Sequence, residues 1–191
     1  MSIDLPGFAD PVADAQSAFR AVLDALARPG QIRAAGTGLT PPAPLNPAAA
    51  AMLLTLADAD PTVYLGPAFA DAADWVRFHC GTQVTDSPAD ATFILADALP
   101  NLTALPNGTD EEPQSGATIL LQIPALTGGP ARIIHGPGLA TPTTLSPQGL
   151  PPDFAAQWAT NHAQFPRGID LILCAGDHLL ALPRSLSIRE P

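Results

Sequence analysis

Three apolar runs of strand length constrain the fold of this 191-residue chain more than any other feature. They occupy residues 92–96, 118–123 and 169–174. Apolar residues fill these runs without the strict alternation of a strand with one wet face, which indicates strands covered on both faces. Helices are predicted mainly early in the chain and strands late. We therefore expect an α/β fold, specifically a three-layer α/β/α sandwich with a mixed sheet, as one domain over residues 1–191 with its core at about 10–183.

The other predicted elements are marked by capping residues, prolines and β-branched residues. Asp10 and Pro11 are typical of a helix start, and Gly81 is typical of a helix end. Helices are expected at residues 11–27, 46–56, 71–79 and 153–162. Further strands are expected at residues 31–34 on the sheet edge, at 62–65 and at 132–135, with a hairpin turning at Gly176 and Asp177.

Composition excludes several kinds of chemistry. All eight basic side chains are arginines, so the chain has no lysine for a Schiff base, an internal aldimine with pyridoxal phosphate, a phosphate-loop GK[ST] or a lysine general base. The formal net charge of -10 disfavours sequence-independent binding of nucleic acid. Cys80 and Cys174 are the two cysteines and cannot by themselves hold an iron–sulfur cluster or a structural zinc. The chain is thus expected to bind no cofactor or metal of its own.

The sequence also predicts where the protein works. No stretch reaches 18 uninterrupted apolar residues, and residues 1–5 lack the basic start of a signal peptide. We therefore expect a cytoplasmic protein that does not span a membrane.

Asp170 is the most unusual position, because it lies inside the apolar strand at residues 169–173. A buried carboxylate is unfavourable unless it finds a partner. One interpretation is a structural carboxylate that accepts from backbone NH groups or pairs with an arginine at a strand end. The other is a functional residue in a cleft, with Arg167 three residues upstream.

A glycine-bearing turn follows the predicted strand at residues 132–135. Gly136 and Gly138 flank a proline directly after His135, and glycines allow a backbone to approach a ligand closely. Glycine–proline pairs also mark ordinary turns. The glycine spacing matches neither a dinucleotide-binding fingerprint nor a phosphate loop.

Arg77 and His79 lie at the end of the third predicted helix, where a cation interacts favourably with the helix dipole. His79 and Cys80 are neighbours in sequence, so their side chains point about 100° apart on a helix. This disfavours a thiolate–imidazole pair.

Seven segments together resemble the PhnH family, whose members are subunits of the bacterial carbon–phosphorus lyase system for phosphonate utilisation. They are DPVADAQSAFR at 10–20, LLTLAD at 53–58, RFH at 77–79, ATF at 91–93, SGAT at 115–118, GPG at 136–138 and FPRGIDLIL at 165–173. The resemblance runs in order from about Asp10 to Pro183. The segments at 39–47 and 110–113 depart from it and look specific to this lineage.

The resemblance implies a homodimer that joins PhnG-, PhnI- and PhnJ-type subunits in a core complex. It also implies a fold similar to the large domain of pyridoxal-phosphate-dependent transferases, without that cofactor. In such complexes a phosphonate is coupled to the ribose of ATP, adenine is released, and a ribose 1-phosphonate 5-triphosphate forms. The resemblance assigns the nucleosidase-like chemistry to the PhnI-type subunit and radical cleavage of the C–P bond to the PhnJ-type subunit.

The resemblance transfers no catalytic residue, so the catalytic residues stay unknown. The residues expected at a ligand cleft or a subunit contact are Arg77, His79, His135, Gly136, Gly138, Arg167, Gly168 and Asp170. We expect an accessory or structural subunit. The alternatives are a subunit that binds a nucleotide or phosphonate and contributes residues to the transferase step, and a vestigial transferase-like enzyme that acts alone.

Overall fold

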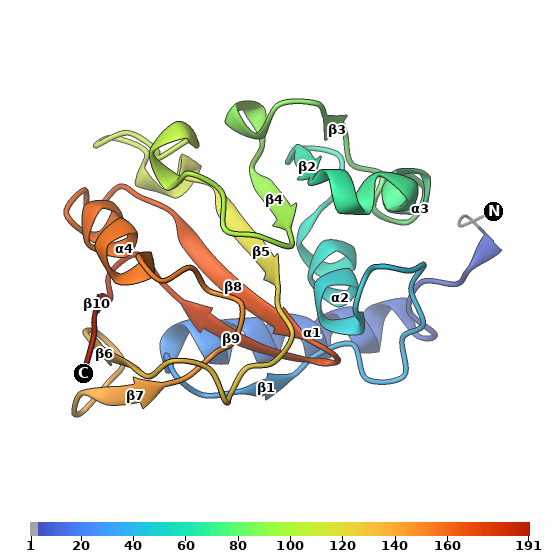
Figure 1. Cartoon of the computed structure of the whole chain (residues 1–191). Coiled ribbons are helices and arrows are strands. Elements are labelled where there is room, and N and C mark those ends of the chain that lie inside the picture. The colour runs from blue at the N-terminus through green and yellow to red at the C-terminus, as the bar shows by residue number, and fades with distance from the viewer. Residues whose placement is uncertain (1–3) are drawn as a thin grey trace.

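A mixed seven-stranded sheet forms the centre of the computed structural model, which describes residues 4–191 (Figure 1). In spatial order its strands are β1 (Arg33–Ala34), β9 (His178–Leu182), β8 (Asp170–Ala175), β5 (Thr118–Gln122), β4 (Phe93–Ala96), β2 (Val63–Leu65) and β3 (Val84–Thr85). The strands from β3 to β8 pair in parallel, whereas β9 runs antiparallel to both of its neighbours. The predicted α/β class and mixed sheet are confirmed. The prediction that residues 1–5 lack the basic start of a signal peptide falls partly on residues 1–3, which lie outside the described residues.

The parallel strands are buried on both faces, as their apolar runs predict. Side chains alternate along a strand, so Leu171 and Leu173 of β8 pack in the hydrophobic core on one side of the sheet. Ile172 and Cys174 pack in the core on the other side. All four side chains are almost completely inaccessible to solvent.

Helices α1 (Pro11–Ala27), α2 (Pro47–Leu56) and α3 (Ala73–Cys80) contribute to the core on one face. α1 lies against β1 and β9, and α2 contacts β5, β8 and β9. The Asp10 side chain accepts from the first free NH groups of α1, and the Asn46 side chain does the same for α2. α1 has the predicted bounds, whereas α2 begins one residue after the predicted start because Asn46 is its cap. Within residues 4–191, no helix is both long and apolar enough to cross a bilayer.

The third predicted helix, at residues 71–79, begins later than expected. Its first two residues belong to the 3-10 helix η2 (Pro67–Ala72), and the α-helix proper starts at Ala73. The physical reason is that no side chain caps the start of α3, which continues directly from the turn that Pro67 begins. Gly81 ends the helix as predicted, because its φ of 70° lies in the left-handed region that favours glycine.

The opposite face of the large sheet is covered by α4 (Phe154–His162) and a second sheet. That sheet has the antiparallel order β10 (Ser187–Arg189), β6 (Arg132–His135) and β7 (Thr143–Leu145). An α/β/α sandwich has an outer layer made of helices alone. The outer layer on this face differs from that prediction, because it contains a small sheet as well as α4. β7 and β10 were not predicted, because three partly polar residues are too few to show a strand period.

Tight packing of α2 generates a stability prediction. Four consecutive alanines, residues 48–51, have no exposed surface between α1 and the sheet. We expect Ala50→Leu to lower the free energy of unfolding by about 1–3 kcal/mol, because the added atoms cannot fit without displacing neighbours. Urea denaturation measures this. Ala13→Leu on the exposed side of α1 is the control and should change stability by less than about 0.5 kcal/mol. Equal effects of the two substitutions would contradict the prediction.

Candidate functional site

The structure does not gather the predicted site residues into one cleft. Arg77 and His79 belong to α3, on one face of the large sheet. The other six lie on the opposite side, in the turn after β6 and at the start of β8. The segment at residues 183–187 contacts both the turn after β6 and the start of β8, and the sequence analysis did not select this segment.

Asp170 pairs with an arginine, but the partner is Arg184 and not Arg167. Nε and Nη2 of Arg184 donate to Oδ2 of Asp170 at 3.0 and 2.5 Å, and its backbone NH donates to Oδ1 at 2.7 Å. Nη1 of Arg184 also donates to the carbonyl of Pro113 at 2.6 Å. The carboxylate thus has the structural role, because it ties the start of β8 to the end of β9 and, through Arg184, to the acidic loop.

Arg167 lies beside that loop. Its Nε is 3.1 Å from Oδ1 of Asp110, and the two side chains are 42% and 77% exposed. An ion pair this exposed contributes at most about 1 kcal/mol. This contact therefore adds little to the stability of the fold.

Gly168 is required by the close approach of Asn161. Gly168 has φ of 123°, and a Cβ there would lie 2.9 Å from the Asn161 Oδ1. The Asn161 amide, only 1% exposed, donates to the Ile169 carbonyl at 2.9 Å and accepts from the Ile169 NH at 2.8 Å. Sequence reasoning missed Asn161. The signal was its spacing. Asn161 follows Phe154 by seven residues and Trp158 by three, which places it on the buried face of the predicted helix.

Gly136 and Gly138 bring the backbone close to other parts of the chain. A Cβ at Gly136, where φ is 151°, would lie 3.0 Å from a methyl group of Leu186. A Cβ at Gly138 would collide with the carbonyl oxygen of Ala27 at the end of α1. The side chain of His135 is exposed, and its carbonyl accepts from the Ser187 hydroxyl at 3.0 Å. The turn therefore joins β6 to α1 and to the segment before β10.

His79 and Trp75 hold residues 4–9, here called the N-terminal strap, against α3. Nε1 of Trp75 donates to the Leu5 carbonyl at 2.9 Å, and Nε2 of His79 lies 3.0 Å from the same oxygen. Nε2 of His79 must carry a proton to make this bond. Gly7 packs against the ring, since a Cβ at Gly7 would lie 3.0 Å from the His79 Nδ1.

Neither cysteine is a nucleophile in this environment. Burial raises the pKa of the Cys80 thiol to about 12, and burial does the same for Cys174. Both thiols are therefore protonated at neutral pH, which agrees with the poor geometry expected for Cys80 beside His79. Arg77 is exposed and pairs with Asp74 at 3.1 Å. Within residues 4–191, no three His, Cys, Asp or Glu side chains are grouped to hold a metal ion.

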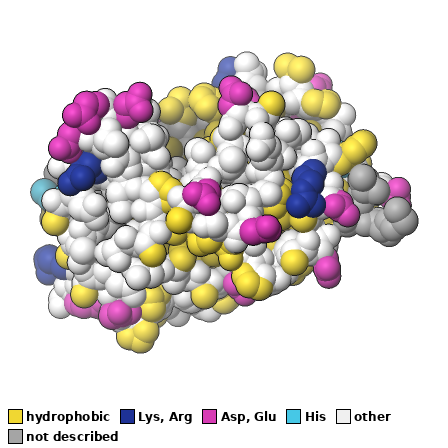
Figure 2. Space-filling model, turned by 90° about the horizontal axis from the view of Figure 1, so that it is seen from above, with side chains coloured by type: hydrophobic (Ala, Val, Ile, Leu, Met, Phe, Trp, Pro, Cys, Tyr) yellow, Lys and Arg dark blue, Asp and Glu magenta, His cyan; other side chains and the backbone are white. Residues whose placement is uncertain are grey.

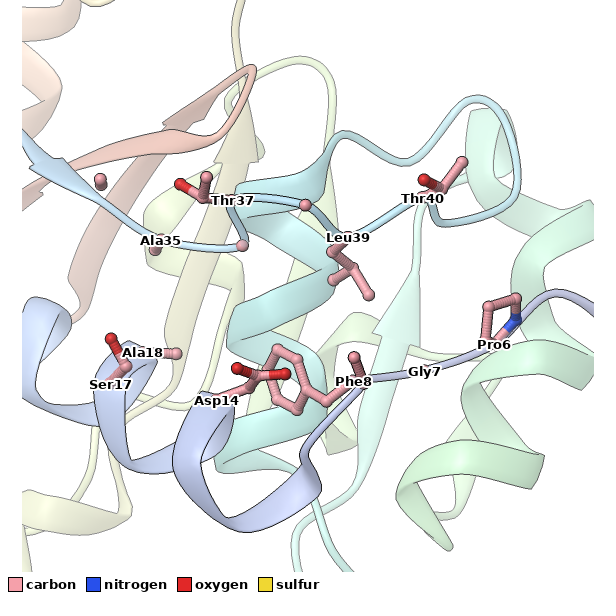
Figure 3. Close-up of a pocket in the computed structure, with 14 residues that line it drawn as sticks. Pro6, Gly7, Phe8, Asp14, Ser17, Ala18, Ala35, Thr37, Leu39 and Thr40 are labelled. Atoms are coloured by element: carbon pink, nitrogen blue, oxygen red, sulfur yellow. The ribbon is translucent and has the colours of Figure 1, made fainter.

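The strap also forms one wall of a cavity of about 380 Å³ (Figure 3). The other walls are the start of α1, with Asp14 and Ser17, and the segment after β1, with Thr37 and Thr40. Sequence reasoning did not find this cavity, because its walls come from three separate stretches of the chain. His79 therefore lies close to the cavity, but its ring binds the strap and is not part of the cavity lining.

Comparison with known proteins gives consistent matches. The family described as "Bacterial phosphonate metabolism protein (PhnH)" matches residues 6–189. The chain is 44% identical, over 96% of its length and 94% of the relative, to the alpha-D-ribose 1-methylphosphonate 5-triphosphate synthase subunit PhnH of Rhizobium meliloti (strain 1021). It is 32% identical, over 91% of its length and 85% of the relative, to the putative C-P lyase subunit protein HtxG of Stutzerimonas stutzeri.

Asn161 should be a stability residue. We expect Asn161→Ala to lower the free energy of unfolding by about 2–4 kcal/mol, because it leaves the buried NH and carbonyl of Ile169 without partners. Chemical denaturation followed by circular dichroism measures this. Thr160→Ala, one residue earlier and exposed, should change stability by less than about 0.5 kcal/mol. An equally small effect at Asn161 would refute the assignment.

His79 should control the strap more than global stability. We expect His79→Leu to speed amide hydrogen exchange in residues 5–9, while the free energy of unfolding falls by only about 1 kcal/mol, the worth of one hydrogen bond. Hydrogen exchange read by mass spectrometry on the N-terminal peptide tests this. His135→Leu, at an exposed histidine away from the strap, is the control. Unchanged exchange in the His79 variant would show that the strap does not depend on the imidazole.

Proposed function

Because the chain belongs to the PhnH family of bacterial phosphonate metabolism proteins, we propose that it is a subunit of a carbon–phosphorus lyase system. With partner subunits it supports formation of a ribose 1-phosphonate 5-triphosphate from a phosphonate and ATP, with release of adenine. The relative at 44% identity is named a subunit of such a synthase, and the relative at 32% is named a putative C-P lyase subunit. Alignment over almost the whole chain supports the same role here.

An accessory role fits the side chains better than independent catalysis. The Asp170 carboxylate is occupied by Arg184, and the amide of Asn161 is occupied by the Ile169 backbone. Residues that match the family thus position the backbone and each other. The exposed pair of Arg167 with Asp110 keeps binding of a nucleotide or phosphonate as the alternative role.

The observation that carries the proposal is an apolar stripe on α1. Val12, Phe19 and Leu23 are 79%, 49% and 55% exposed, and their spacing of seven and four residues places them on one side of the helix. Exposed apolar patches rimmed by polar residues mark interaction sites. Leu23 lines an open groove together with Asp24 and Arg33, which pair with one another.

We assign this stripe to a homodimer contact, and assign PhnG-, PhnI- and PhnJ-type subunits to other surfaces. The helix that carries the stripe packs against β1, an edge strand of the large sheet, and edge strands are common sites of pairing between chains. On the face shown in Figure 2, arginines are few and lie among acidic side chains. This charge pattern supports protein partners and disfavours nucleic acid.

The proposal also covers location and cofactor. The protein acts in the cytoplasm and holds no pyridoxal phosphate, because no lysine is present to bind it. We propose that its resemblance to the large domain of pyridoxal-phosphate-dependent transferases concerns the fold alone. The mixed sheet supports this, and fold by itself does not imply activity.

Co-expression tests the proposal. We expect the wild-type chain to copurify with PhnG-, PhnI- and PhnJ-type subunits of its host and to be dimeric alone by light scattering. Leu23→Asp should yield a monomer, because it places an unpaired charge in an apolar contact. Phe165→Asp, at a comparably exposed phenylalanine away from α1, should stay dimeric. A wild-type monomer that recovers none of these subunits would rule out the subunit role.

A further inference from the structure

The cavity beside the strap carries an inference that does not depend on the proposed function. Its volume of about 380 Å³ lies within the range of small-molecule sites, roughly 300–1,000 Å³. Figure 3 shows residues 35–40 along one side and α1 with the strap along the other. The space is therefore bounded on opposite sides by separate segments of this chain.

The polar side chains of the lining are one carboxylate, which only accepts, and three hydroxyl groups, which both donate and accept. Asp14 is the one charged side chain among the described residues that line the cavity. Its Oδ2 accepts from the Asp10 NH at 3.0 Å, which leaves Oδ1 available to a ligand. Ser17 and Thr40 add hydroxyl groups that make no hydrogen bond within the described chain. With a carboxylate and no cation in its lining, the cavity attracts donors and repels anions.

Apolar side chains form part of the remaining lining, beside Thr37 and the glycine backbone. Ala18 and Ala35 are buried, and Phe8 and Leu39 are partly buried and pack against the core below. Apolar side chains with a few placed polar groups are typical of small-molecule sites.

The wall formed by residues 35–40 is held in place without a ligand. The Ala35 NH donates to the Asp177 carbonyl at 2.7 Å, and the Thr37 hydroxyl donates to the Asp177 carboxylate at 3.1 Å. A Cβ at Gly36 would collide with the Pro47 carbonyl, so the loop approaches α2 as closely as glycine allows. The site is therefore preformed on this side, and the strap fastened by His79 forms the other side.

We propose that this cavity binds a small, uncharged nitrogen heterocycle that carries amino groups, the chemistry of a free nucleobase. Ring NH and amino groups donate to Asp14, Ser17 and Thr40, while the ring covers the apolar floor of the cavity. A phosphate on the same molecule disfavours binding, since it would lie near Asp14 with no cation in the lining to offset it. His79 is a positioning residue for this site, because it acts through the strap.

Titration of the full-length protein with adenine and with AMP tests the proposal by calorimetry. We expect adenine to bind, and AMP to bind at least about tenfold more weakly. Asp14→Asn should bring the affinities for adenine and AMP closer together, because it removes the charge that repels phosphate. Ser17→Leu should weaken adenine binding by about tenfold or more, because it fills the cavity.

Two controls separate these effects from loss of folding. Gln16→Leu adds the same side chain to α1 outside the cavity lining, and Glu111→Gln removes a carboxylate from the acidic loop. Both should bind adenine as the wild type does, and thermal melts confirm that every variant is folded. The proposal is overturned if millimolar adenine gives no binding, if AMP binds as well as adenine, or if folded Ser17→Leu binds adenine normally. None of these outcomes bears on copurification with partner subunits.

Discussion

Burial of the central strands on both faces is the constraint on which the rest of the structure depends. β5 and β8 have no solvent-facing side, so each needs a cover above and below. Helices α1 to α3 supply one cover, and α4 with the small antiparallel sheet supplies the other. A strand enclosed in this way also needs partners for the polar groups at its ends. Asn161 and Arg184 supply them at the start of β8, one through the Ile169 backbone and the other through Asp170.

Local signals predicted the helices and long strands well. The side chains of Asp10 and Asn46 cap their own helices, so a few adjacent residues suffice to predict each start. β3, β7 and β10 have two or three residues each, and their pairing depends on tertiary contacts that no short window contains. The partner of Asp170 was predictable from the sequence. The predicted hairpin pairs Leu171 with Leu182, and this register brings Arg184 beside Asp170.

The candidate sites were harder to predict, because residue type does not show whether a side chain faces a ligand or the protein. His79 matches the family and lies beside a cavity, yet its ring binds the Leu5 carbonyl. The cavity itself comes from a strap, a helix and a loop whose meeting follows from the path of the chain. The residues that line the cavity follow no regular period or motif in the sequence. No local pattern in the sequence therefore predicts the cavity.

The arginines explain why an anionic substrate needs more than this chain. Six of the eight form ion pairs with carboxylates of the same chain, and Arg132 and Arg184 are in addition nearly buried. Only Arg20 and Arg189 have no carboxylate partner among the described residues, so this chain offers a triphosphate few unpaired cations. Because the net charge is -10, the field of the whole protein does not help. The two proposals agree with both limits: the apolar stripe on α1 is proposed to contact a second copy of this chain, and the cavity lined by one carboxylate is proposed to hold an uncharged ligand.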